Sequence, residues 1–232
     1  MQFKSRSYEK EFLDRDDIST KDLYRTLVEL DVINTYLGGY KATLDGFKAI
    51  LKSNSKINQV LDIGFGGGDS IKQLSAFANK NDRKIFFYGV DLKEDCINYA
   101  EENLASIPNK KLICDDYRNI SPTLLEQIDV IHCSLFLHHL TDEEINNLFK
   151  FCRKHNCTIL ANDLHRNWMA YYSIKFLTAI LSKSWLVKND ACLSVRRAFK
   201  KSELEMFLKN AGYTNYSVKW SWAFRYIIIG FK

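Results

Sequence analysis

The pattern of hydrophobic positions changes at about residue 55. Residues 1–54 carry apolar side chains at helical spacing, interrupted at Gly38 and Gly39, and contain no strand-like run. From residue 55 onward, short apolar runs alternate with segments of helical period. Runs that are apolar at both odd and even positions are typical of parallel strands buried on both faces. The pattern therefore predicts an N-terminal helical extension over 1–54 and an α/β domain over 55–232.

The strands of that domain are expected at 59–63, 84–90, 111–114, 128–134 and 157–162. Two further runs, 216–220 and 223–231, are rich in β-branched and aromatic residues and predict a C-terminal antiparallel hairpin at or near one sheet edge. Between strands, the spacing of Thr141 with Glu144 and of Ser202 with Glu205 is that of the capping box that begins a helix. The fold class is thus a doubly wound α/β sheet.

One apolar segment, Trp168 to Val187, approaches the ~20 residues that a membrane-spanning helix needs. Lys175, Thr178 and Ser182 fall on one stripe of it. This stripe predicts a largely buried helix with one solvated edge, or a flap over a site, within an insertion at about 165–198. A membrane span is the alternative, which the lysines disfavour, so no stable membrane insertion is expected.

Composition and charge narrow the class of protein only slightly. The chain has 232 residues, 46% of them hydrophobic and 26% charged, with a net charge of +5, which is ordinary for a globular protein. Its six cysteines lack C-x-x-C spacing and its N-terminus has no apolar core. These features predict reduced thiols, no signal peptide and a cytoplasmic protein. We expect a monomer or homodimer.

A glycine-rich turn is the most informative motif. The first expected strand carries Asp62 next to its end and is followed by Gly64, Gly66 and Gly68, then by a helical pattern. Glycines there permit positive φ and close approach of a ligand, and the helix N-terminus offers unpaired N–H groups. Asp69 occupies the place of the third glycine of a dinucleotide motif, and no Gly-Lys-Ser/Thr follows. The turn therefore predicts a nucleoside site of another kind.

Acidic residues end the neighbouring strands. Asp91 ends the second, Asp115 and Asp116 follow the third, and Ser134 ends the fourth. The carboxyl ends of parallel strands meet at one crevice. Several carboxylates there would repel a pyrophosphate but suit a ligand with a sulfonium and an ammonium group.

With these motifs, residues 55–232 resemble class I S-adenosylmethionine-dependent methyltransferases, which implies a Rossmann-like fold and S-adenosylmethionine as cofactor. Asp62 and the glycines are similar to the family's acidic-x-Gly-x-Gly-x-Gly motif. The resemblance implies a cofactor site in which Asp91 binds ribose, Leu92 packs on adenine, Asp115 beside Asp116 reads the adenine amino group, and the backbone at Cys133 and Ser134 holds the methionine part.

A narrower likeness comes from 137–140, 162–166 and 193–199, which resemble bacterial small-molecule methyltransferases. Some of those accompany polyketide or quinone pathways and methylate phenolic oxygens. The likeness implies a small aromatic, phenolic or lipophilic acceptor and favours O-methylation. Lys200 departs from it, because such enzymes often carry a threonine helix cap there; Ser202 is expected to provide the cap instead.

Candidate catalytic and acceptor residues follow from strand ends and aromatic content. A phenol has a pKa of about 10, and a histidine base could take its proton; His165 is favoured, with His138 second, and a structural role is open for both. For the acceptor we expect an aromatic wall and a guanidinium clamp, with packing and surface pairing as the alternatives. The proposed acceptor residues are Tyr36 in the N-terminal lid, Trp168, Tyr171, Tyr172, Trp185 and Arg196 or Arg197, while Lys41 is a candidate for the methionine carboxylate.

Other functions are disfavoured by features that the sequence lacks. A Pro-Pro-aromatic turn after the fourth strand, a Pro-Cys nucleophile and a basic stripe with interleaved aromatics do not occur, so nucleic acid is not expected as a partner. No tight cluster of metal ligands at suitable spacing occurs either, so no metal is expected. An RNA or protein methyltransferase, a non-catalytic S-adenosylmethionine-binding module and a dehydrogenase are the alternatives.

Overall fold

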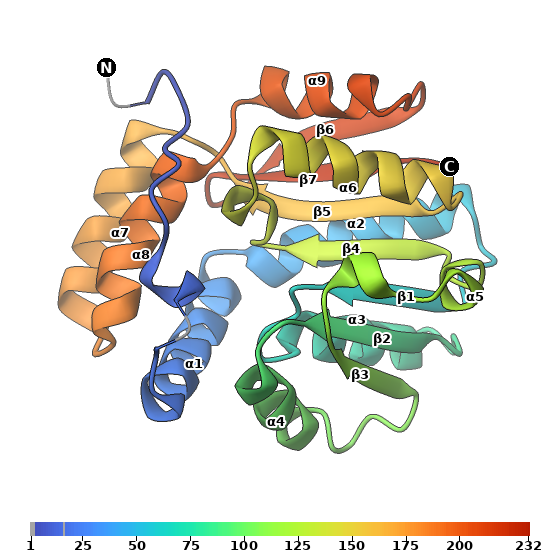
Figure 1. Cartoon of the computed structure of the whole chain (residues 1–232), viewed down its shortest axis with the longest axis horizontal. Helices are drawn as coiled ribbons and strands as arrows, with labels where there is room; N and C mark the ends of the chain where they lie inside the picture. The colour runs from blue at the N-terminus through green and yellow to red at the C-terminus, as the bar shows by residue number, and fades with distance from the viewer. Residues whose placement is uncertain (1–2, 16) are drawn as a thin grey trace.

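The computed structural model describes residues 3–15 and 17–232. Seven strands form one sheet in the order β3-β2-β1-β4-β5-β7-β6 (Figure 1). The strands are β1 (Gln59–Ile63), β2 (Phe86–Asp91), β3 (Lys110–Cys114), β4 (Val130–Ser134), β5 (Thr158–Leu164), β6 (Tyr216–Ser221) and β7 (Arg225–Gly230). β1 to β5 are parallel, and β7 runs antiparallel between β5 and β6. The predicted α/β sheet with its terminal hairpin is confirmed.

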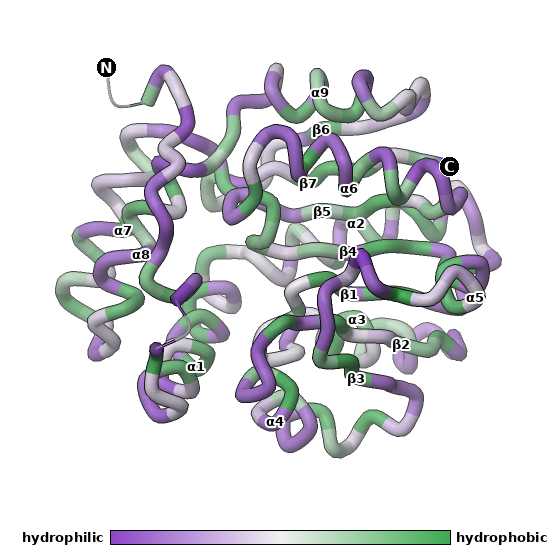
Figure 2. The backbone as a smooth tube through the Cα atoms, viewed as in Figure 1, coloured by the Kyte–Doolittle hydropathy of each residue, from purple (hydrophilic) through white to green (hydrophobic). Residues whose placement is uncertain are grey.

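Helices cover both faces of the sheet, and each face has its own core. On one face lie α2 (Gly39–Ser53), α3 (Asp69–Lys80) and α4 (Glu94–Asn103), where Phe47 and Leu74 are fully buried. On the other lie α5 (Pro122–Leu125), α6 (Asp142–Lys154) and α9 (Lys201–Asn210), where Phe149 and Leu204 are fully buried. Figure 2 shows hydrophobic residues running along the central strands β4 and β5 between these layers, as expected for strands covered on both faces.

A third group of helices stands beyond the carboxyl ends of the strands. It comprises α1 (Thr20–Tyr36), α7 (Trp168–Leu181) and α8 (Trp185–Arg197), and residues 3–15, hereafter the N-terminal strap, run across α8 (Figure 1). The strap contains the short helix η1 (Phe12–Asp14); the other single turns are η2 (Tyr117–Asn119) and η3 (Leu137–His139). This group therefore covers the edge at which a doubly wound sheet binds its ligands.

A buried ion pair fixes the start of the strap. The Arg166 side chain is fully buried and pairs with both carboxylate oxygens of Glu203, at 2.6 and 3.0 Å. Its remaining donors reach the carbonyl oxygens of Phe3, Lys4 and Ala198. Each bond to a carbonyl uses a donor that would otherwise be buried without a partner, so Arg166 joins the strap to the loop that precedes α9.

The expected single helix from Trp168 to Val187 is two helices. The chain turns between α7 and α8, where the Glu29 carboxylate accepts from the backbone N–H groups of Lys183 and Ser184, both at 2.8 Å. The expected solvated edge is found only in part: Lys175 is exposed, but Thr178 is buried and the apolar Phe176 is 66% exposed. Among the described residues, no helix is both long and apolar enough to cross a bilayer.

Two further details differ from expectation. α2 packs on the face of the sheet beside α3, through Phe47 and Ile50. Of the N-terminal segment predicted as a lid, only α1 and the strap therefore stand over the carboxyl ends of the strands. α9 begins at Lys201 with Lys200 as its N-cap. The Glu203 carboxylate accepts from the Lys200 backbone N–H at 2.7 Å. The expected cap at Ser202 is therefore wrong. The capping box pairs Lys200 with Glu203, two residues before the predicted pair of Ser202 with Glu205.

Candidate active site

The glycine turn has the geometry that its sequence predicted. Gly64, Gly66 and Gly68 have φ of +65°, +56° and +80°, and Gly68 is the N-cap of α3. A Cβ on Gly64 would lie 2.3 Å from Cδ2 of Phe136. The turn thus needs glycine twice over at this position, once for the backbone angle and once for the close ring.

Asp91 joins the turn to the end of β2. Its carboxylate accepts from the Gly66 N–H at 3.0 Å and from the Lys93 N–H at 3.1 Å. Burial raises the pKa of Asp91 above its ordinary range, although these backbone hydrogen bonds oppose the shift. The side chain borders the main cavity, and the contact of its carboxylate with ribose hydroxyl groups stays a prediction.

The other expected cofactor residues at the strand ends also border the cavity. Leu92 is 70% exposed beside it, and an exposed leucine there offers an apolar face to a base. Asp115 accepts from the side chain of Asn119 at 2.8 Å. Hydrogen bonds from Arg118 lower the pKa of Asp116. Ser134 completes the set at the end of β4.

Asp62 and Cys133 lie behind the cavity lining. Asp62 is buried, with Oδ1 2.7 Å from Nδ1 of the equally buried His132 on β4. Cys133 belongs to the core of the α6 face, and burial raises the pKa of its thiol well above the usual range. The structure therefore places both side chains under the crevice, where they support its floor; their contact with a cofactor stays a prediction.

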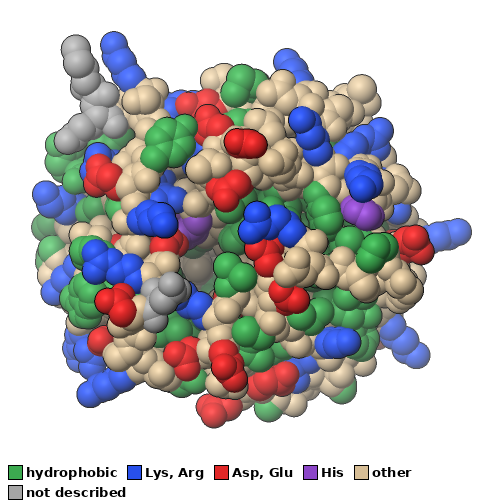
Figure 3. All heavy atoms as spheres, viewed as in Figure 1, with side chains coloured by type: hydrophobic (Ala, Val, Ile, Leu, Met, Phe, Trp, Pro, Cys, Tyr) green, Lys and Arg blue, Asp and Glu red, His purple; other side chains and the backbone are tan. Residues whose placement is uncertain are grey.

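The main cavity has a volume of about 780 Å³ and extends from the glycine turn beneath α1, α7 and α8. In Figure 3 this face of the molecule is hollowed near its centre, with charged side chains of both signs around the opening. The helical walls are largely apolar. Their apolar residues are Leu23, Leu27, Leu30 and Ile33 from α1, Ala170, Ile174 and Leu177 from α7, and Leu186, Val187, Ala191 and Val195 from α8. Thr26, Asn34, Ser173, Asp190 and Ser194 of the same helices add polar groups to the lining.

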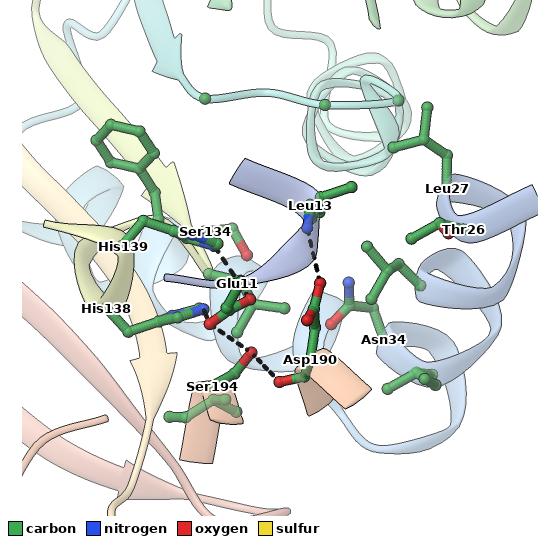
Figure 4. Close-up of a pocket in the computed structure, with 18 of the residues that line it drawn as sticks. Glu11, Leu13, Thr26, Leu27, Asn34, Ser134, His138, His139, Asp190 and Ser194 are labelled. Carbon is green, nitrogen blue, oxygen red and sulfur yellow. Dashed lines mark hydrogen bonds and ion pairs between the residues drawn. The ribbon is translucent and has the colours of Figure 1, made fainter. Parts of the chain in front are cut away.

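A cluster of acid–base groups, which we call the Glu11–His138–His139 cluster, lies in this cavity (Figure 4). Nε2 of His138 is 3.6 Å from Glu11 Oε1, and Nε2 of His139 is 3.9 Å from Glu11 Oε2. Glu11 comes from the strap, and both histidines come from η3 after β4. The fold thus brings a carboxylate from the first dozen residues against two imidazoles from the middle of the chain.

A second carboxylate holds each imidazole of the cluster at Nδ1. The His138 ring lies 2.8 Å from Asp163 Oδ1, and the His139 ring lies 2.7 Å from Asp14 Oδ1. Burial acts to lower the pKa of His139, but the hydrogen bond with Asp14 and the charge of Glu11 outweigh it and raise that pKa. Burial acts to raise the pKa of Asp163, yet His138 outweighs it and lowers that pKa.

Residues of α8 fix Glu11 and the histidine backbone. Ser194 donates its hydroxyl to Glu11 Oε1 at 3.0 Å. The Arg197 guanidinium donates to the carbonyl oxygens of Glu9, His138 and His139. Arg197 therefore ties the strap to η3 through the backbone of both segments. The strap residues were absent from the sequence-based site, because only their position in the fold shows their role.

The favoured base, His165, does not line the cavity. Its ring packs on Tyr226, with ring centroids 5.0 Å apart, and burial lowers its pKa. His138, the second choice, does line the cavity. Both follow a strand of the predicted sheet, but the chain leaves β5 with Leu164 toward the cavity and the next side chain, His165, away from it.

The residues expected to contact the acceptor are also placed elsewhere. Tyr36, Trp168 and Tyr172 are 79%, 59% and 57% exposed and do not line the cavity, because α1 and α7 turn other faces inward. Arg196 pairs with Glu9 at 2.8 Å. The wall that α7 presents is therefore aliphatic instead of aromatic, and a role for these four residues in acceptor binding stays a prediction without a contact to support it. Lys41 likewise pairs with Asp45, one helical turn along α2.

Comparisons with known proteins agree with this geometry. Residues 60–156 match the family model described as a methyltransferase domain. The plantazolicin methyltransferase BpumL, solved in complex with SAH, superposes with a TM-score of 0.65 at 20% identity, covering 89% of this chain and 76% of that one. A SAM-dependent methyltransferase from Aquifex aeolicus superposes with a TM-score of 0.58 at 16% identity, covering 92% and 98%. A search of curated proteins found no match.

The solved structures establish the fold, and the family match covers the glycine turn and the acidic strand ends at which the cofactor site is predicted. Residues 60–156 therefore belong to the methyltransferase domain family whose model they match. Together the comparisons support a methyltransferase enzyme with S-adenosylmethionine as its cofactor.

Proposed function

We propose that the chain transfers the methyl group of S-adenosylmethionine to a small lipophilic acceptor bound beneath α1, α7 and α8, with a hydroxyl oxygen as the favoured acceptor atom. One observation carries this proposal: a single cavity runs from the glycine turn to the Glu11–His138–His139 cluster between apolar walls. Such a cavity can hold a donor at one end and an acceptor at the other.

The donor end follows from the placement of the strand termini. Asp91 would accept from the ribose hydroxyls, Leu92 would pack against adenine, and the methionine part would lie toward Gly64 and Ser134. In this orientation the sulfonium methyl group would face the deeper part of the cavity. In the reaction the acceptor oxygen forms a bond to the methyl carbon as the carbon–sulfur bond breaks, leaving a neutral thioether.

The acceptor end needs positioning and the removal of one proton. Holding the two reactants in line accounts for most of the rate gain in such a displacement. The hydroxyl proton would pass to the Glu11–His138–His139 cluster, where Asp163 holds the His138 ring in a fixed orientation. Proton transfer to a positioned group contributes about 10²–10⁴-fold.

The walls favour a small apolar acceptor over a macromolecule. Ile174 and Leu177 of α7 and Leu186 of α8 line the cavity, and the helices that carry them cover it. A nucleic acid instead needs an open basic surface. The following experiment can also reveal the alternatives, which are methylation of RNA or protein and cofactor binding without catalysis.

The experiment supplies methyl-tritiated S-adenosylmethionine with a panel of phenols, hydroxyquinones and long-chain alcohols, and with RNA and a protein mixture. We expect label in a lipophilic hydroxyl compound. Leu177→Trp, which fills the cavity, should lower that turnover at least tenfold, whereas Phe176→Trp on the exposed side of the same helix should leave it unchanged. Label found only in RNA or protein, or equal activity of the two variants, would contradict the proposal.

A further inference from the structure

The Glu11–His138–His139 cluster has a feature that proton transfer alone does not require. Both histidines use Nδ1 to bind a carboxylate, so both present Nε2 to the same third carboxylate, Glu11 (Figure 4). The separations of 3.6 and 3.9 Å exceed hydrogen-bond length. The three groups thus face one point without bonding to each other.

That arrangement has the dimensions of a metal site. The candidate ligand atoms of Glu11, His138 and His139 all lie within 4.8 Å of one another. Two donors bound at about 2.1 Å to a tetrahedral ion lie about 3.4 Å apart. Shifts of at most about 0.7 Å in each side chain would therefore bring all three atoms to coordinating distance.

The surroundings of both imidazoles also match a metal site. Imidazoles that bind metals almost always donate their other ring N–H to a carboxylate or carbonyl, which fixes the tautomer and aims the free lone pair. Asp163 and Asp14 occupy that position for His138 and His139 respectively. Two imidazoles that are each held at Nδ1 and that face one carboxylate indicate a metal site more specifically than a cluster of acidic residues does.

Nearby cations do not take the place of a metal ion. The Arg197 donors reach carbonyl oxygens, and its closest approach to the Glu11 carboxylate is 3.8 Å. Ser194 donates one hydrogen bond to Glu11 Oε1, which leaves a second lone pair on that oxygen and both on Oε2 for coordination.

We propose that Glu11, His138 and His139 bind one divalent first-row transition-metal ion, with an open coordination position toward the cavity. Two nitrogen donors select zinc, cobalt, nickel or iron over magnesium and calcium, which prefer oxygen. Ion binding itself is independent of the acceptor. Its role in catalysis rests on the proposed function and would replace direct proton acceptance by the cluster, because the Nε2 lone pairs would then bind the ion. A hydroxyl group at the open position would ionise more readily, since a bound ion lowers the pKa of a coordinated oxygen acid, and its proton would pass to solvent.

The experiment uses tag-free protein that has been treated with a chelator and dialysed. Isothermal titration with Zn²⁺ measures stoichiometry and affinity, and titration with Co²⁺ measures the visible d–d bands that report nitrogen and oxygen coordination. The variants Glu11→Gln and His139→Asn remove one ligand each. His155→Asn is the matched control, because His155 caps α6 outside the cavity. Circular dichroism verifies that each variant is folded.

We expect one ion per chain, with cobalt bands, in wild type and in His155→Asn. Affinity should fall by about a hundredfold or more in Glu11→Gln and His139→Asn, and by about 10–100-fold in Asp14→Asn, which loses only the group that orients His139. Failure of Zn²⁺ to bind stoichiometrically, or equal loss in His155→Asn, would overturn the proposal; the cobalt spectrum tests it even if a variant misfolds. Retained SAH binding in the same samples would show that the cofactor site is intact, so the metal site can fail without the proposed function failing.

Discussion

Replacement of Gly64 by alanine tests whether the glycine turn is held by the close packing described above. Gly64 has φ of +65°, and an added Cβ would lie 2.3 and 2.9 Å from Cδ2 and Cε2 of Phe136. The left-handed backbone costs an alanine about 1–2 kcal/mol. Forcing a methyl group against a packed ring costs about 1–3 kcal/mol more. The free energy of unfolding should therefore fall by about 2–5 kcal/mol.

Gly212→Ala is the matched control, because Gly212 has φ of +84° and nothing lies within 4 Å of its added Cβ. It measures the backbone cost alone, so it should lose only about 1–2 kcal/mol. Urea unfolding monitored by circular dichroism gives both values. Calorimetry should also show weaker SAH binding for Gly64→Ala than for Gly212→Ala, since Phe136 must move beside the turn. Equal destabilisation of the two variants would refute the reasoning about Phe136.

Three further outcomes are expected. Asp91→Asn should weaken SAH binding by about 10–100-fold, because hydrogen bonds to a charged group contribute about 1.5–3 kcal/mol. Asp95→Asn, at a half-buried position of α4 outside the main cavity, should not weaken it. Equal affinities of the two variants in calorimetry would argue against the ribose site. Because the pKa of Asp91 is raised, its carboxylate is present above that raised pKa and lost as pH falls through it, so SAH affinity should decline at a higher pH than an ordinary aspartate would give. Glu203→Ala should destabilise the protein by about 3–5 kcal/mol, because it leaves the buried Arg166 without its carboxylate. Glu205→Ala, which removes a surface ion pair with Lys201, should cost at most about 1 kcal/mol. Similar urea midpoints for the two variants would contradict this expectation.

The parts of the fold that depend on local pattern were predictable from the sequence. Apolar runs of strand length located all seven strands, with ends that differ by no more than two residues. The Thr141–Glu144 capping box begins α6 as expected, with Glu144 N–H donating to the Thr141 hydroxyl at 3.2 Å. The glycine turn was predictable because its glycines follow an apolar run of strand length and precede a helical pattern, and Asp91 was predictable because it ends the next strand along the chain.

The acceptor side was not predictable in the same way. Which face of α7 points inward depends on how α7 packs against α8, and the two inward residues Ile174 and Leu177 are no more apolar than the outward Phe176. The contribution of Glu11 depends on the path of the strap across α8, which no spacing in the sequence encodes. The group around His138 therefore became visible only in the folded chain.

The central claim is that one cavity joins the donor at the glycine turn to an acceptor end at the Glu11–His138–His139 cluster. A crystal structure of the chain with SAH tests this claim most directly. The account predicts ribose hydroxyls within hydrogen-bond distance of Asp91 and a sulfur atom that faces the cavity beneath α7 and α8. SAH bound elsewhere, or bound with its sulfur directed away from that cavity, would contradict the account.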